Sequence, residues 1–330
     1  MRRTILSLVS ISLILSISVN SETKGRSANA SKNSGKKVLA LWRQPSDIRT
    51  RNLFYGAGGR AGQPKAPFHF IEEDRGGSNP KFIVTDASGA RWKVKLGEEA
   101  RPETAATRLL WAAGYFTDVD YYFPQFHVSG LQKLNRGMKY VSPDGTIHGG
   151  RFERSFKKID DWSWFENPFI GSREFNGLRV MMALINNWDL KQENNAIYNV
   201  NDRELRYVVS DLGGTFGKTG GDWTRSKGDV GDYSETKFIH KVTNKDVDFV
   251  LHNRPPFLYA VAVPYYAKRV EMEKVGEDIP RSHARWIGHQ LSQLSNDQIK
   301  DIFRAAGYSP VEVEGFSRKL RGRINQLNGL

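Results

Sequence analysis

The chain has 330 residues, and its formal net charge at pH 7 is +13. It contains no cysteine, which excludes disulfides, thiol chemistry and zinc sites built on thiolates. The positive charge favours anionic partners, but the basic residues are spread along the chain without a nucleic-acid-binding motif, so nucleic acid is not the expected partner.

The N-terminus has the composition of a secretory signal peptide. Two arginines precede an apolar, serine-rich run from Thr4 to Val19, so we expect residues 1–21 to be removed on export. This run is shorter than the roughly 20 residues that a bilayer requires, and no later segment is apolar enough to span one. Residues 22–37 are polar and basic, which is typical of a disordered linker. We therefore predict an exported protein, periplasmic, extracellular or in a secretory lumen, without a transmembrane segment after signal removal.

The first part of the mature chain predicts a small antiparallel sheet followed by one helix. Three stretches alternate apolar and polar side chains and are joined by short turns, which is typical of a strand meander. They span residues 66–74, 81–86 and 90–97. Residues 101–115 have an early proline, an apolar stripe at helical spacing and a terminal glycine, which indicates a helix. Residues 118–130 predict a further strand, and we place the end of this lobe at residue 125, giving 38–125.

The rest of the chain, residues 126–330, predicts a larger and mostly helical lobe. A hairpin is expected over 138–152, and apolar residues at helical spacing predict a helix over 172–187. Two short strands are then expected, and Ser295 is a candidate N-cap for a later helix. Those strands lie within 195–200 and 205–214. The order of elements predicts a two-lobed α+β fold, with ligands bound in the cleft between the lobes.

The third strand and the helix after it carry a candidate cation–carboxylate pair. Lys93 and Lys95 share one face of the strand, because side chains repeat every two residues there. Glu103 lies on the apolar side of the helix, where a carboxylate requires a cationic partner. The spacing leaves the choice between the two lysines open. Glu98 and Glu99 are alternative partners if the helix begins earlier.

Two further polar clusters follow apolar elements. Asp189, Lys191 and Asn194 come directly after the helix predicted at 172–187, and Asp211 ends an apolar strand before two glycines. Each residue alone is compatible with a surface turn. Together these residues supply the groups that phosphoryl transfer requires: a lysine held by a glutamate, an acid, an amide and a second acid. They also follow the expected order along the chain.

These residues carry a resemblance to the protein-kinase-like superfamily. The stretch "DLKQEN" is similar to its catalytic loop, "SDLGG" to its metal-binding DFG segment, and "WKVKLG…PETAATRLL" to its lysine strand and glutamate helix. The resemblance covers residues 66–220 and points to the atypical branch, with HipA-like, phosphatidylinositol-kinase-like and Fam20-like secreted kinases. The sequence departs from typical protein kinases at Asn187 and Trp188, which replace a His-Arg pair, and at Leu212, which replaces the DFG phenylalanine.

The resemblance implies a nucleotide site in the small lobe. It implies that Lys95 binds the phosphates of ATP and that Glu103 holds this lysine, with Lys93 as the alternative. The glycine-rich loop would be "DRGGSNP", which contains Gly76 and Gly77.

The resemblance also implies a catalytic loop and a metal site. It assigns Asp189 as the base, Lys191 to the transferred phosphate, and Asn194 with Asp211 to Mg²⁺ or Mn²⁺. The expected activity is phosphoryl transfer from ATP to an unidentified hydroxyl on a protein, lipid or small molecule.

Other functions fit the same residues. A nucleotidyl transferase would hold ATP reversed in the same cleft, and a pseudokinase would use the fold as a scaffold. A basic secreted protein that binds a polyanion would show steep salt dependence and no magnesium-dependent nucleotide binding. The oligomeric state is open.

Overall fold

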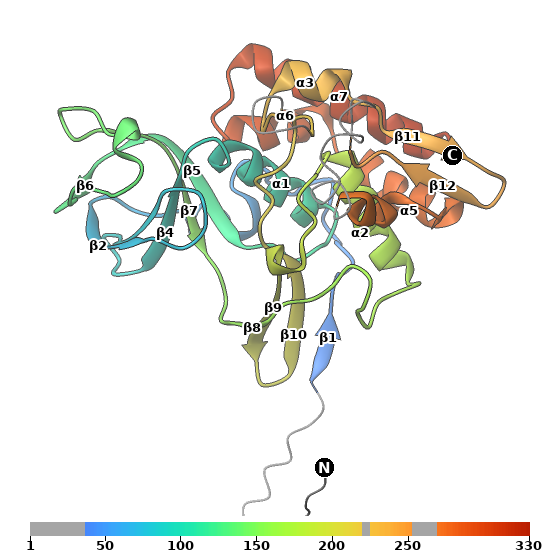
Figure 1. The fold of residues 1–330 in the computed structure, drawn as a ribbon, viewed down its shortest axis with the longest axis horizontal. Helices are drawn as coiled ribbons and strands as arrows, with labels where there is room; N and C mark the ends of the chain where they lie inside the picture. The colour runs from blue at the N-terminus through green and yellow to red at the C-terminus, as the bar shows by residue number, and fades with distance from the viewer. Residues whose placement is uncertain (1–36, 220–224, 253–268) are drawn as a thin grey trace, which may run out of the picture. The chain divides into compact units, whose positions relative to one another are not determined.

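The computed structural model describes residues 37–219, 225–252 and 269–330 (Figure 1). The signal peptide expected at residues 1–21 and nearly all of the linker expected at 22–37 lie outside the described residues. Lys37 does not belong to a linker, because its Nζ donates a hydrogen bond to Asn199 Oδ1 at 2.9 Å. Within the described ranges, no helix is both long and apolar enough to cross a membrane.

A six-stranded sheet forms the small lobe, in the order β5-β7-β4-β3-β2-β6. Its strands are β2 (Phe68–Asp74), β3 (Lys81–Thr85), β4 (Arg91–Leu96), β5 (Val119–Phe126), β6 (Val128–Ser129) and β7 (Ile147–Arg154). Neighbouring strands are antiparallel except β2 and β6. Alternate residues of β3 and β4, such as Phe82 and Val94, are buried in one apolar cluster, as the period of two requires. The three meander strands expected from the sequence are confirmed.

The sheet continues past the lobe boundary expected at residue 125. β6 pairs with β2, and β7 lies between β4 and β5. The hairpin expected over 138–152 is confirmed only at its turn, where Val141 bridges Ile147 and the Ser142 N–H donates to the Thr146 carbonyl at 2.9 Å. Along its length, β7 pairs with β4 and β5 instead. The beginning of the expected lobe also lies elsewhere, since Leu41 and Leu53 pack in the core of the helical lobe.

One helix, α1 (Ala100–Ala112), connects the two lobes. It contacts β5 and β7 of the sheet and α6 of the helical lobe, and it lies between them in Figure 1. Its apolar stripe, including Ala105 and Leu109, is fully buried in the large core. The helix begins one residue earlier than expected, with Glu99 as its N-cap. This early start brings Glu99 close to the strand that precedes the helix.

The large lobe combines helices with two small sheets. α2 (Arg173–Leu184) is capped by Ser172, whose hydroxyl accepts a hydrogen bond from the Phe175 N–H. The four-stranded sheet has the order β1-β10-β9-β8, and a three-stranded sheet has the order β11-β12-β13, which the sequence did not predict. These strands are β1 (Val38–Ala40), β8 (Lys158–Asp160), β9 (Asn195–Asn201), β10 (Glu204–Val209), β11 (Ile239–Val242), β12 (Asp246–Phe249) and β13 (Ile279–Pro280).

The C-terminal helices close the core of this lobe. The further helices are α3 (Val230–Glu235), α5 (Arg281–Ser292), α6 (Asn296–Ala305) and α7 (Pro310–Asn328), with 3-10 turns η1 (Gly56–Gly58), η2 (Met138–Tyr140), η3 (Gln192–Asn194) and η5 (Lys274–Gly276). Ser295 caps α6 as expected, in a complete capping box with Gln298. Ser309 forms the same motif with Glu312 at the start of α7. The α+β fold with a small sheet lobe and a larger helical lobe is confirmed.

Candidate active site

The lysine expected to bind phosphate lies at the centre of three carboxylates. The Nζ of Lys95 is 2.8 Å from Glu103 Oε2, 3.4 Å from Glu99 Oε2 and 3.5 Å from Asp211 Oδ1. These four residues come from β4, α1 and its N-cap, and the segment after β10. Burial acts to lower the pKa of Lys95, but the carboxylates, Glu103 above all, raise it well above its ordinary value. The ammonium therefore stays charged, as phosphate binding requires.

Lys95, and not Lys93, is the lysine of the site. Lys95 is buried, whereas Lys93 is only partly buried and lies opposite Glu153 of β7 in the sheet. Both lysines share one face of β4, as expected, but only Lys95 is close enough to α1 to reach Glu103. The ambiguity in the sequence is resolved by the packing of the helix against the end of the strand.

A second cation, which the sequence analysis missed, holds Glu103 from the sheet side. Arg151 of β7 is fully buried, and its Nη1 lies 3.0 Å from Glu103 Oε2 and 2.8 Å from Glu153 Oε2. Its Nε donates to Asp120 Oδ2 at 2.9 Å, and Asp120 also pairs with Arg108. Burial raises the pKa of Glu103, and Arg151 and Lys95 oppose the rise. Glu103 thus depends on both cations for its charge.

Glu99 connects the site to the glycine-rich segment after Asp211. Its Oε1 is 2.6 Å from Lys227 Nζ, and its Oε2 accepts a hydrogen bond from Asn79 Nδ2. Burial acts to raise the pKa of Glu99, but Lys95 and Lys227 hold it at about 2. Gly213 passes so close that a Cβ there would lie 2.6 Å from the Cβ of Glu99. The sequence offered Glu99 as an alternative to Glu103; in the structure Lys95 contacts both carboxylates.

The glycines of the expected phosphate loop do not reach this cluster. Gly77 has a φ of 64° in the turn between β2 and β3, and its carbonyl accepts a hydrogen bond from Arg136. Gly76 donates its N–H to Asp74. Among the contacts of the described residues, it is Asn79, at the end of the same loop, that touches the site. The assignment of Gly76 and Gly77 to the nucleotide stays a prediction.

The expected catalytic loop is a turn held by its own side chains. Asp189 donates its backbone N–H to Asn187 Oδ1 at 3.1 Å, and its carbonyl accepts a hydrogen bond from Asn194 Nδ2 at 2.8 Å. The Lys191 ammonium lies 2.9 Å from Asp189 Oδ1. His252 Nε2 is 3.1 Å from the Trp188 carbonyl oxygen. These contacts fix the backbone on both sides of Asp189, and among the described residues its carboxylate has an ion pair only with the half-exposed Lys191.

Asn194 connects this loop to Asp211 of the Lys95 cluster. Its carbonyl accepts hydrogen bonds from the backbone N–H groups of Ser210 at 3.0 Å and Asp211 at 3.2 Å. Because Asn194 Nδ2 donates to Asp189, its Oδ1 is the atom that remains for a ligand. Amide and carboxylate oxygens both suit Mg²⁺ or Mn²⁺, which prefer oxygen ligands. The residues expected to bind metal are thus brought together.

Three carboxylates also gather closely enough to hold a cation. Oxygen atoms of Glu99, Glu103 and Asp211 lie within 4.8 Å of one another. The Lys95 ammonium contacts all three, so it already provides the positive charge at this point. Asp211 is the member shared between the lysine cluster and Asn194.

The chain has an α+β fold with a small sheet lobe and a larger helical lobe. No protein-family model matches it, and no curated protein matches it. Solved structures do: the Helicobacter pylori proinflammatory kinase CtkA has 11% identity and a TM-score of 0.44, over 81% of this chain and 98% of that one. The Golgi casein kinase with Mn/ADP bound has 11% identity and a TM-score of 0.38, over 80% and 74% of the two chains. WaaP in complex with acyl carrier protein has 13% identity and a TM-score of 0.28, over 78% and 88%.

Proposed function

We propose that this protein transfers the γ-phosphoryl group of ATP to a hydroxyl. One observation carries the proposal: Lys95 Nζ lies 2.8 Å from Glu103 and 3.5 Å from Asp211, residues of three different elements. Asp211 is in turn hydrogen-bonded through its backbone to Asn194 of the Asp189 loop. A phosphate-binding cation, oxygen ligands for a metal and a candidate base therefore form one continuous site.

The residues divide the chemistry between them. Lys95 binds and orients the phosphates, and Glu103 and Arg151 keep the lysine in place. The acceptor hydroxyl binds beside Asp189: its oxygen bonds to the γ-phosphorus, the bond to the bridging oxygen breaks, and ADP leaves. The hydroxyl proton passes to the Asp189 carboxylate, and Lys191 lies close enough to stabilise the transferred group. A divalent ion bound by Asn194 and Asp211 would neutralise charge on the phosphoryl oxygens.

Nucleotide binding is tested first, by thermal unfolding of the purified protein with ATP, with and without Mg²⁺. A ligand at about 100 times its Kd adds ~2.7 kcal/mol to the stability of the folded state. We expect this stabilisation to require Mg²⁺ and to be lost in Asp211→Asn. The matched control is Asp202→Asn in the exposed turn between β9 and β10, which should respond like the native protein. Absence of any magnesium-dependent shift would refute the proposal.

Chemistry is tested separately with ATP labelled at the α- or γ-phosphate. We expect label only from the γ-position, and a loss of about 10²- to 10⁴-fold in transfer in Asp189→Asn with nucleotide binding retained. Transfer of α-label would indicate a nucleotidyl transferase. Magnesium-dependent binding without transfer, unchanged in Asp189→Asn, would indicate a pseudokinase.

A further inference from the structure

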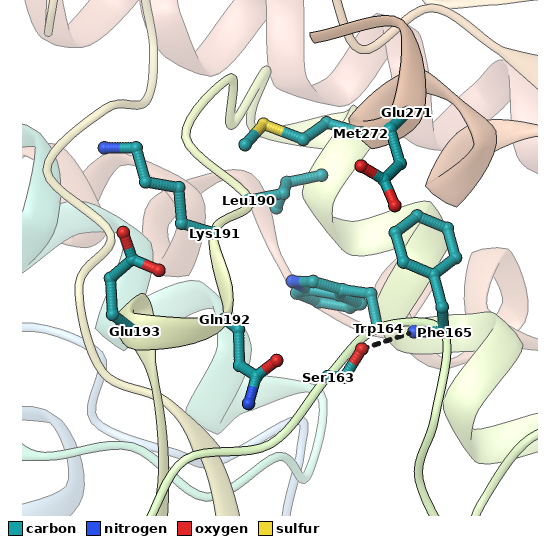
Figure 2. Close-up of a pocket in the computed structure, with 9 residues that line it drawn as sticks. All are labelled: Ser163, Trp164, Phe165, Leu190, Lys191, Gln192, Glu193, Glu271 and Met272. Atoms are coloured by element: carbon teal, nitrogen blue, oxygen red, sulfur yellow. Dashed lines mark hydrogen bonds between the residues drawn. The ribbon is translucent and has the colours of Figure 1, made fainter. Parts of the chain in front are cut away.

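A cavity of about 300 Å³ lies beside the catalytic loop, on the large lobe alone. Its walls include Trp164 and Phe165 from the segment before α2, Leu190 from the loop, and Glu271 and Met272. We call it the Trp164 pocket (Figure 2). No residue of the six-stranded sheet lines it, so it is separate from the Lys95 site. It shares Lys191 with the catalytic loop, which places it next to Asp189.

The indole of Trp164 lines this pocket and carries a buried hydrogen-bond donor. The residue is only 5% exposed, and its Nε1 has no hydrogen-bond partner among the described residues. Figure 2 shows the indole between the lining residues, with its nitrogen directed toward the Leu190–Gln192 stretch. A buried donor without a partner is unfavourable, so a ligand whose carbonyl oxygen accepts from it would be bound favourably.

The opposite wall combines an exposed aromatic ring with a carboxylate. Phe165 is 46% exposed, and its backbone is held by the hydrogen bond from its N–H to Ser163 Oγ at 3.1 Å. Figure 2 shows the carboxylate of Glu271 directed toward the Phe165 ring, whereas Lys191 and Glu193 extend away from Trp164. Glu271 forms no ion pair with another described residue. An aromatic ring beside a carboxylate favours a cation on an apolar stem.

We propose that the Trp164 pocket binds a basic side chain, arginine or lysine, of a polypeptide acceptor close to the hydroxyl that is phosphorylated. The proposal rests on the proposed kinase function and adds the class of acceptor. The peptide carbonyl accepts the Trp164 N–H, the aliphatic stem packs on Phe165 and Met272, and the cationic group pairs with Glu271. A polypeptide supplies the carbonyl, the stem and the cation together.

The net charge of the protein allows a specific preference for arginine to be distinguished from non-specific electrostatic attraction. With a formal net charge of +13, long-range electrostatics favour acidic peptides over basic ones. A preference for arginine therefore requires a local acidic site. Non-specific attraction would give the opposite order.

Binding is measured first, without nucleotide, by fluorescence anisotropy with two labelled peptides that each contain one serine, flanked by arginines or by glutamates. We expect the arginine peptide to bind about tenfold more tightly, because the exposed Glu271 carboxylate attracts arginine and repels glutamate. Glu271→Lys should remove the preference, and Trp164→Phe, which keeps the ring, should weaken binding about fivefold. Glu166→Lys is the matched control: it makes the same charge change on an exposed residue outside the lining and should leave the preference intact.

Phosphoryl transfer from Mg-ATP to the same peptides is then measured, to test whether the pocket binds the acceptor during the reaction. We expect Glu271→Lys to raise KM for the arginine peptide about tenfold and to leave kcat unchanged. Competition by spermidine as strong as by the arginine peptide would show that the pocket binds a free polyamine and would overturn the polypeptide assignment. Equal binding of both peptides, a preference for glutamate, or no binding would overturn the proposal itself. A failure of magnesium-dependent ATP stabilisation would instead overturn the kinase function, because the binding assay contains no nucleotide.

Discussion

Replacing Arg151 by methionine isolates the contribution of the buried charge network behind the active site. Arg151 contacts three carboxylates, and its removal leaves them with different numbers of cationic partners. Glu103 keeps Lys95 and Asp120 keeps Arg108, but Glu153 loses the only ion pair recorded for it among the described residues. Removing one partner of a buried ion pair costs about 3–5 kcal/mol. Because two of the three carboxylates retain a cation, we expect a cost of ~3 kcal/mol at pH 7.

The cost should also depend on pH. In the native protein burial acts to raise the pKa of Glu153, and Arg151 is the main group that lowers it. Without Arg151 the folded-state pKa of Glu153 rises above its value in the unfolded chain, about 4.3. Such a group stabilises the folded state fully below that unfolded value, and the stabilisation is lost as pH rises through the folded-state pKa. The variant should therefore lose most stability near pH 8 and less near pH 5.

The assay is urea unfolding of both proteins at several pH values, beside Arg91→Met as a control. Arg91 is also a strand arginine in an ion pair, but its side chain and that of Glu72 are each 62% exposed. Exposed pairs contribute about 0–1 kcal/mol. Equal losses in the two variants, or a loss for Arg151→Met that grows on acidification, would refute this account of the network.

Three further predictions concern the site and its scaffold. Glu99→Gln should destabilise the protein by ~2 kcal/mol at pH 7, because the pKa of Glu99 is lowered to about 2 in the folded protein. The difference in urea midpoint between the two proteins should vanish as pH falls from 4.5 toward 2. A difference that persists below pH 2 would contradict this. Gly213→Ala should destabilise the folded protein by about 1–3 kcal/mol and weaken its stabilisation by Mg-ATP, because the new Cβ would lie 2.6 Å from Glu99. Gly214→Ala should destabilise it less, since the nearest atom there is 3.3 Å away. The reverse order would count against the clash. Ser309→Ala should cost about 1 kcal/mol in calorimetry by removing the capping box of α7, and an unchanged Tm would show that the cap is dispensable.

The sequence by itself determined the elements whose signal is local. Alternation along the chain predicted β3 and β4, helical spacing predicted α2, and the capping Ser295 predicted the start of α6. The candidate residues Lys95, Glu103, Asp189, Asn194 and Asp211 were predicted because charged residues at the ends of apolar elements require partners or a function. The order of these residue types along the chain led to the hypothesis of phosphoryl transfer.

Only the tertiary structure decided which charges meet. Arg151 reaches Glu103 because β7 lies between β4 and β5, and a pairing between strands so far apart has no local sequence signature. Lys227 and Glu99 are likewise joined across 128 positions. The choice of Lys95 over Lys93 depended on where α1 packs, since both lysines have the same strand periodicity. Periodicity determines the face on which a side chain lies, whereas its partner on that face is determined by the packing of distant segments.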